Sequence, residues 1–143
     1  MRIAIAVLTF AVGLPWVAWG AECERPQAAE TAIDNLDSWA KVHTFFREFA
    51  KCDDGGIAEG VSDKVEILLS KHWGELNMLA PLAATDRAFA GFVVRHVDDL
   101  WTAHDLRAVD LMAQTQCPRN AHELCRDIHA QVLSLGPIAP DEG

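Results

Sequence analysis

Residues 38–50, SWAKVHTFFREFA, contain the pattern that decides the fold class. Apolar residues recur there three and four positions apart, at Trp39, Val42, Phe46, Phe49 and Ala50. That spacing is typical of a helix with one buried face. We therefore expect a helix from Asp37 or Ser38 to about Ala50, with its aromatic stripe in the core of the protein.

The same period continues after an acidic, glycine-rich segment. Its apolar positions are Ile57, Val61, Val65, Leu68, Leu69 and Trp73. A second helix is expected to start near Gly56, with Asp53 or Asp54 as its N-cap. Gly60 would lie inside this helix, where a tolerated glycine often marks the close approach of a neighbour. Pro81 is expected to break the chain.

Three further helix starts follow in the second half of the chain. Asp86 is the expected cap of a helix with His96 on its apolar face. Thr102 and Asp105 form a capping box that opens the next helix. Asn120 with Glu123 is expected to open the last helix. No segment alternates with a period of two for long enough to form a strand. The sequence predicts an all-α fold, a single small array or bundle of about five helices.

The N-terminus has the features of an export signal. Arg2 is followed by an apolar run to Val12, and small residues surround the expected cleavage between Gly20 and Ala21. We expect residues 1–20 to be a signal peptide, and residues 21–143 to form one helical domain with a flexible tail at 135–143. The expected location is periplasmic or secreted. The alternative is an uncleaved membrane anchor.

The mature chain is strongly acidic. The full sequence has 12 Lys and Arg against 21 Asp and Glu, a net charge of −9, and loss of Arg2 with the leader makes this −10. Nucleic acids and anionic lipid surfaces are disfavoured partners, because both attract clustered Lys and Arg. No stable membrane insertion is expected after cleavage. A basic protein partner is favoured, and a homodimer is the alternative.

Four cysteines, an even number in an exported chain, predict two disulfides. We favour Cys23 with Cys52 and Cys117 with Cys125, the pairing with the shorter loops, and the two other pairings stay open. In the chain-entropy model, a loop of about 30 residues contributes ~3–4 kcal/mol and one of about 9 residues ~2.5 kcal/mol.

Two motifs offer metal-site alternatives. Cys117, His122, Cys125 and His129 have spacings like those of compact zinc sites, although an oxidising compartment favours the disulfide. The acidic residues between Asp53 and Asp63 do not fit the spacing of a calcium-binding EF-hand loop. No cofactor is expected. The sequence has no nucleophile elbow, metalloprotease motif or phosphate loop, so we expect a protein without catalytic activity.

The segment from Asp53 to Asp63 is the expected partner-binding surface. Asp53, Asp54, Glu59 and Asp63 supply negative charge there, and Gly55, Gly56 and Gly60 allow another backbone to approach closely. The structural alternative is that the glycines serve a tight turn and a helix crossing, while the acids cap a helix and are solvated.

Two motifs carry a resemblance to known proteins. Residues 52–63 read Cys-Asp-Asp-Gly-x-Ile-Ala-Glu-Gly-x-Ser-Asp, and residues 117–125 read Cys-Pro-x(6)-Cys. With the export signal, they resemble small secreted bacterial helical proteins and, more loosely, periplasmic immunity proteins that neutralise type VI secretion amidase toxins. The resemblance implies an inhibitor that plugs the active-site cleft of a cell-wall-degrading hydrolase. The alternative is a small periplasmic metal- or ligand-binding or stress protein.

Overall fold

The computed structural model describes residues 22–138, and every regular element in that range is a helix. The predicted all-α fold with two disulfides is confirmed, although the described residues form more helices than the five or so predicted. The described range contains seven α-helices: α1 (Pro26–Ile33), α2 (Trp39–Phe49), α3 (Gly55–Lys71), α4 (Leu76–Thr85), α5 (Arg87–Arg95), α6 (Ala103–Thr115) and α7 (His122–Ser134). Three single-turn 3-10 helices join them: η1 (Ala50–Cys52), η2 (Trp73–Glu75) and η3 (Arg119–Ala121).

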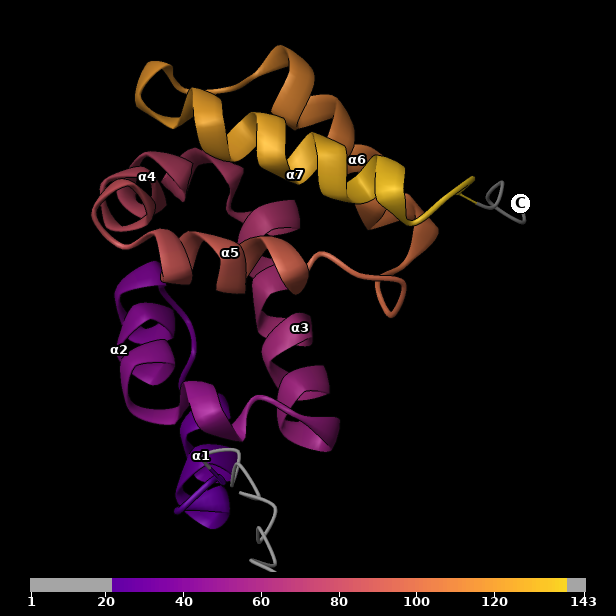
Figure 1. Ribbon diagram of the computed structural model, residues 1–143. Coiled ribbons are helices and arrows are strands. Elements are labelled where there is room, and N and C mark those ends of the chain that lie inside the picture. The colour runs from indigo at the N-terminus through magenta and orange to yellow at the C-terminus, as the bar shows by residue number, and fades with distance from the viewer. Residues whose placement is uncertain (1–21, 139–143) are drawn as a thin grey trace, which may run out of the picture.

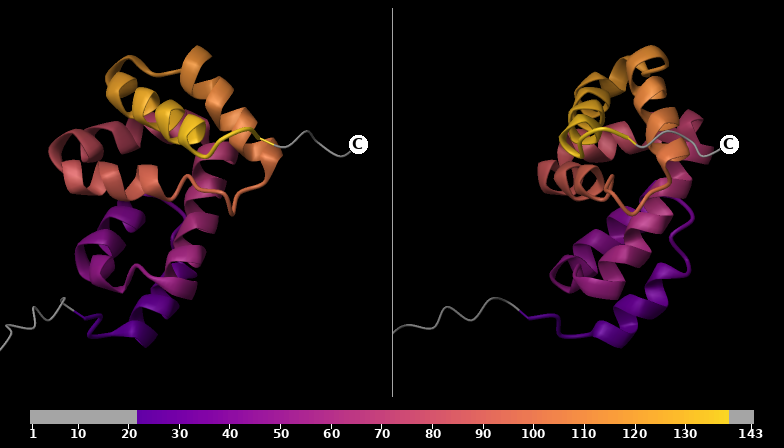
Figure 2. Two further views of the ribbon diagram at one scale, coloured as in Figure 1. Left: turned by 45° about the vertical axis from the view of Figure 1, so that its right-hand side comes forward. Right: turned by 90° about the vertical axis from the view of Figure 1, so that its right-hand side faces the viewer.

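The helix α3 organises the molecule, because it is the longest and contacts helices at both ends of the fold. Near its start it packs against α1, and further along it packs against α6 (Figures 1 and 2). The helices α4 and α5 pack on each other and lie between α2 and the hairpin formed by α6 and α7. One continuous core runs through this arrangement and includes Trp39, Val61, Phe89, Phe92 and Ile128.

Three of the predicted helix starts are confirmed by their hydrogen bonds. The Asp54 carboxylate accepts from Gly55 N at 2.9 Å, and the Asp86 carboxylate accepts from Phe89 N at 3.0 Å. The Thr102 hydroxyl accepts from Asp105 N at 3.1 Å. Each bond satisfies a backbone donor that the first turn of a helix leaves unpaired.

The break predicted at Pro81 is wrong, because Pro81 lies inside α4. Proline has no N–H for the carbonyl four residues earlier, which belongs to Asn77. The side chain of Asn120 donates to that carbonyl at 3.3 Å. The prediction that Asn120 caps the last helix is therefore wrong. Instead, Asn120 lies in η3 and helps α4 to accommodate its proline.

The favoured cysteine pairing is confirmed. Cys23 is bonded to Cys52 and Cys117 to Cys125, with sequence separations of 29 and 8 residues. The first disulfide ties the start of the described chain to η1, and the second joins the two sides of the α6–α7 connection. Both thiols of the alternative zinc site are therefore used in a disulfide.

The predicted signal peptide, at residues 1–20, lies outside the described residues, as does the end of the predicted tail after residue 138. Within residues 22–138, no helix is both long enough and apolar enough to cross a membrane. Disulfides are typical of proteins in oxidising compartments.

Candidate functional site

One side of α3 carries a row of acidic residues that face away from the core. Glu59, Asp63 and Glu66 follow one another at spacings of four and three, so they lie on successive turns of one helix face. Ile67, next to Asp63 on this face, is 48% exposed. We call these four residues the α3 face. Glu59 and Asp63 have no basic partner within the described part of the chain.

Asp53, by contrast, does not belong to an open acidic surface. Its side chain is only 6% exposed and accepts from Arg95 Nη2 at 2.6 Å and from His96 Nε2 at 2.9 Å. Burial by itself would raise the pKa of the Asp53 carboxyl, but hydrogen bonds from His96 and Arg95 outweigh burial, and the pKa is lowered. The sequence reasoning that gave Asp53 an unpaired charge is wrong.

His96 is the hydrogen-bonded core histidine that the apolar pattern predicted. Its Nδ1 lies 2.7 Å from the carbonyl oxygen of Phe92, and its Nε2 faces Asp53. Both neighbours are hydrogen-bond acceptors, so the ring is held between them from two sides. Together, Asp53, Arg95 and His96 fasten the turn after the Cys23–Cys52 disulfide to the end of α5.

The other residues of the predicted segment have roles in the fold. Asp54 caps α3, and Gly55 has a φ of +53°, a backbone conformation that favours glycine. A Cβ on Gly60 would come within 3.1 Å of the Ile33 side chain, so Gly60 permits the close packing of α1 against α3. Of the four predicted acidic residues, the structure leaves Glu59 and Asp63 exposed and without an ionic or capping role.

The loop between α5 and α6 lies directly beside the α3 face. Ser62 Oγ donates to Asp98 at 2.6 Å, and Thr102 N donates to Glu66 Oε1 at 3.0 Å, so both ends of the loop are fastened to α3. Between these two bonds, Leu100 is 60% exposed. The α3 face and this loop thus combine acidic side chains with two exposed apolar ones.

The surroundings of Glu66 disfavour the ionised form of its carboxyl. Burial raises the pKa of its carboxyl, and the nearby carboxylates Asp105 and Asp63 raise it further. Asp105 is itself buried and accepts from Lys71 Nζ at 2.7 Å. Sequence reasoning missed Glu66, although its spacing from Glu59 and Asp63 was a signal that the helix pattern supplied.

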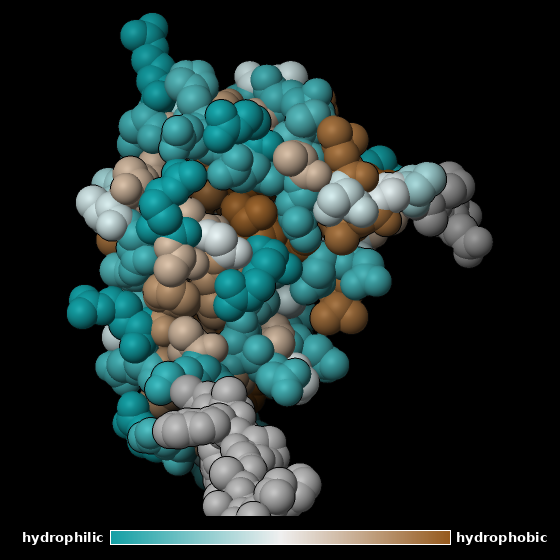
Figure 3. Space-filling model, viewed as in Figure 1, coloured by the Kyte–Doolittle hydropathy of each residue, from teal (hydrophilic) through white to brown (hydrophobic). Residues whose placement is uncertain are grey.

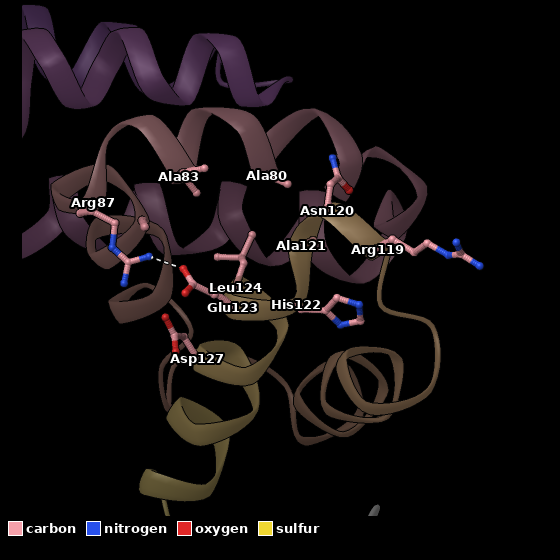
Figure 4. A pocket seen from close by; sticks show the side chains of 12 residues that line it. Ala80, Ala83, Arg87, Arg119, Asn120, Ala121, His122, Glu123, Leu124 and Asp127 are labelled. Atoms are coloured by element: carbon pink, nitrogen blue, oxygen red, sulfur yellow. Dashed lines mark hydrogen bonds and ion pairs between the residues drawn. The ribbon is translucent and has the colours of Figure 1, made fainter.

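A small cavity of about 260 Å³ lies between α4, α5, η3 and α7 (Figure 4). Its floor is formed largely by alanines, including Ala80, Ala83 and Ala121. Arg87 reaches along its edge to Glu123, with 2.8 Å between Nη1 and Oε2. The charged residues that line it are only partly buried or exposed, so we find no buried polar group that would orient a ligand.

The four residues of the alternative zinc site line a second hollow, of about 340 Å³, between α6 and α7. Cys117 and Cys125 are joined there, and His129 Nδ1 lies 2.6 Å from Asp110 Oδ1. Within residues 22–138, no group of three or more metal-ligating side chains is arranged to hold an ion.

The face of the molecule seen in Figure 3 is mostly hydrophilic. On the face seen in Figure 3, hydrophobic side chains gather around α6 and the C-terminal end of α7. The exposed large apolar residues include Leu111 of α6 and Leu133 of α7.

Comparison with family models, with curated proteins and with solved structures found no match for this chain.

Proposed function

We propose that this chain is a non-enzymatic protein of the periplasm, or secreted, that binds and inhibits a cell-wall-degrading hydrolase. The observation that carries the proposal is the α3 face, where Glu59 and Asp63 are unpaired and Ile67 is exposed beside the loop of Leu100. Protein interfaces combine an apolar centre with a polar rim, and negative charge steers a basic partner to this one.

Two further features suit an inhibitor. The Cys23–Cys52 disulfide restrains the chain just before α3, and two hydrogen bonds fasten the α5–α6 loop to this helix, so docking at this surface costs less conformational entropy. Glu66 carries an ionisable carboxyl although its surroundings disfavour its charge. Residues that work against the stability of their own fold are expected at functional surfaces. The likeness to immunity proteins supplies the class of target.

The test uses two matched charge reversals in the mature protein. Glu59→Lys with Asp63→Lys alters the α3 face, and Glu30→Lys with Glu48→Lys makes the same charge change at exposed sites on α1 and α2. Hydrolases from periplasmic extracts that the immobilised wild-type chain retains at low salt are purified and assayed on isolated peptidoglycan.

Wild-type protein and the control variant are expected to inhibit peptidoglycan hydrolysis, whereas the α3-face variant should associate at least tenfold more slowly at low salt. Equal inhibition by both variants would remove the α3 face as the docking surface. Failure of the wild-type chain to inhibit any retained hydrolase would overturn the proposed function. Light scattering of the free protein tests the alternative partner, a second copy of the chain.

A further inference from the structure

We propose that the Cys117–Cys125 disulfide is a thiol–disulfide exchange site for a small anionic thiol. This inference does not rest on the proposed function. The disulfide lines the open hollow of about 340 Å³ between α6 and α7, where Cys117 is half-buried and Cys125 is buried. An attacking thiol can therefore reach Cys117 from solvent, whereas Cys125 lies beneath it.

The charge of this hollow differs from that of the rest of the chain. The ionisable side chains that line it are His122, Arg126 and His129, with no carboxylate among them. The hollow beside Cys52 has a balanced lining of three acids and three bases, which are Glu22, Glu24, Glu48, Arg25, Arg47 and Lys51. Arg126 carries the permanent positive charge of this lining. Its side chain is 68% exposed and its Nη2 lies 3.3 Å from Asp127 Oδ1, a surface ion pair of the weak kind, so its guanidinium stays available to an anion. Of the two disulfides, this one is therefore better placed to react with an anionic thiol.

His129 is positioned to serve as a base in the exchange. It lies one helical turn after Cys125 on α7, and its Nδ1 is held by Asp110 of α6 at 2.6 Å. Because a carboxylate accepts the hydrogen bond, the shared proton belongs to Nδ1, which leaves Nε2 able to accept another proton. The titratable and charged groups near the ring are Asp110, His122, and Arg126 with its ionic partner Asp127.

The exchange then runs in one balanced step. The incoming thiol gives its proton to His129 Nε2, and its sulfur attacks Cys117 Sγ. The bond between the two cysteine sulfurs breaks, and its electron pair leaves with Cys125 Sγ, which recovers the proton from His129. The products are a mixed disulfide on Cys117 and a free thiol on Cys125. Cys125 also lies in the first turn of α7, where the helix dipole favours the departing thiolate.

The first experiment compares the two disulfides within the same wild-type molecule. The oxidised protein is exposed to 2-mercaptoethanesulfonate, which is anionic, or to cysteamine, which is cationic. Free thiols are then trapped by alkylation and located by peptide mass spectrometry. With the anionic thiol, Cys117–Cys125 should open at least tenfold faster than Cys23–Cys52, with the adduct on Cys117 and the alkyl group on Cys125. The ratio of the two opening rates should be smaller with cysteamine.

Equal rates, faster opening of Cys23–Cys52, or an adduct on Cys125 would overturn the proposal. An equal ratio with both thiols would overturn its preference for an anion. This experiment involves no hydrolase. The proposed function can therefore fail while this inference holds, and this inference can fail while the proposed function holds.

The second experiment tests His129 through its pH dependence. His129→Gln should slow the opening of Cys117–Cys125 several-fold near neutral pH. The deficit should shrink at alkaline pH, where the attacking thiol is already ionised. His72→Gln, at an exposed histidine of the connection between α3 and η2, is the matched control and should leave the rate unchanged. A His129→Gln deficit that is the same at every pH would contradict the role of a base.

Discussion

Asp53, Arg95 and His96 form the most buried charged contact described in this protein. The Asp53 and His96 side chains are 6% and 4% exposed, whereas Arg95 is half-exposed and lies over the Phe92 ring, 4.7 Å from its centroid. Removing one member of a buried charged group destabilises the fold by far more than a surface ion pair stabilises it. The reason is that the remaining group stays buried without a partner for its charge.

Asp53→Asn should therefore lower the free energy of unfolding by about 2–3 kcal/mol at pH 7, less than a fully buried pair because Arg95 reaches solvent. Asp99→Asn, at an exposed carboxylate, is the control and should stay within about 0.5 kcal/mol. Urea denaturation of both variants measures the difference. A change at Asp53 no larger than the control would mean that the contact does not stabilise the fold.

The same carboxyl predicts acid sensitivity. Because its pKa in the folded protein lies below the ordinary value of 3.8, its stabilisation is present above that value and is lost as the pH falls through the folded pKa. Wild-type stability should fall in this acidic range more steeply than that of Asp53→Asn. Parallel curves of stability against pH would exclude Asp53 as the cause.

Glu66 predicts the opposite dependence of stability on pH. Its raised pKa means that the folded state is favoured when Glu66 is protonated, and this advantage is lost as the pH rises above the ordinary value of 4.5 and through the folded pKa. Glu66→Gln should stabilise the protein at pH 7 by on the order of 0.5 kcal/mol, and the gain should vanish in acid. Glu59→Gln, at an exposed site, should show neither effect in the same thermal melts.

At the scale of helices, the sequence predicted where most helices begin, but it predicted poorly where one helix ends and the next begins. The N-caps of three helices could be predicted, because capping is a local interaction between residues close in the chain. These caps are Asp54, Asp86 and Thr102. Pro81 could not be placed correctly, because its tolerance depends on Asn120, 39 positions along the chain. The apolar period likewise continues through η2, so the end of α3 and the start of α4 were not visible in it.

The candidate site divides in the same way. Helical spacing placed Glu59 and Asp63 on an exposed face, whereas the ion pairs that remove Asp53 from that surface come from α5, about 40 residues later. Charge in a sequence does not reveal which acids have found partners. The α5–α6 loop beside the α3 face was missed because its contacts with α3, through Asp98 and Thr102, join residues far apart in the chain.

The Asn77–Asn120 bond predicts a coupling between α4 and η3. Asn120→Ala should cost about 0.5–1 kcal/mol in the wild-type chain, because the Asn77 carbonyl loses its partner. In a Pro81→Ala background the backbone N–H of residue 81 can take that carbonyl, so the cost should largely disappear. Denaturant unfolding of the four proteins in this double-mutant cycle measures the coupling, and simple additivity would contradict it.

At the scale of the whole molecule, one core joins all seven described α-helices, and the disulfides lie at the two ends of the described chain. Replacing Cys23 and Cys52 by serine opens the larger loop and should cost ~3–4 kcal/mol, against ~2.5 kcal/mol for Cys117 and Cys125. Calorimetry of the two double variants compares the losses. A greater loss from the shorter loop would show that native-state contacts, not loop entropy, dominate.

Both disulfides join cysteines that are consecutive in the chain: the first with the second, and the third with the fourth. A chain that emerges N-terminus first into an oxidising space presents Cys23 and Cys52 as a complete pair before Cys117 appears. An oxidant that simply links each new thiol to the one already waiting therefore produces the native connectivity in order. Maturation of this protein should require an oxidase and no disulfide isomerase.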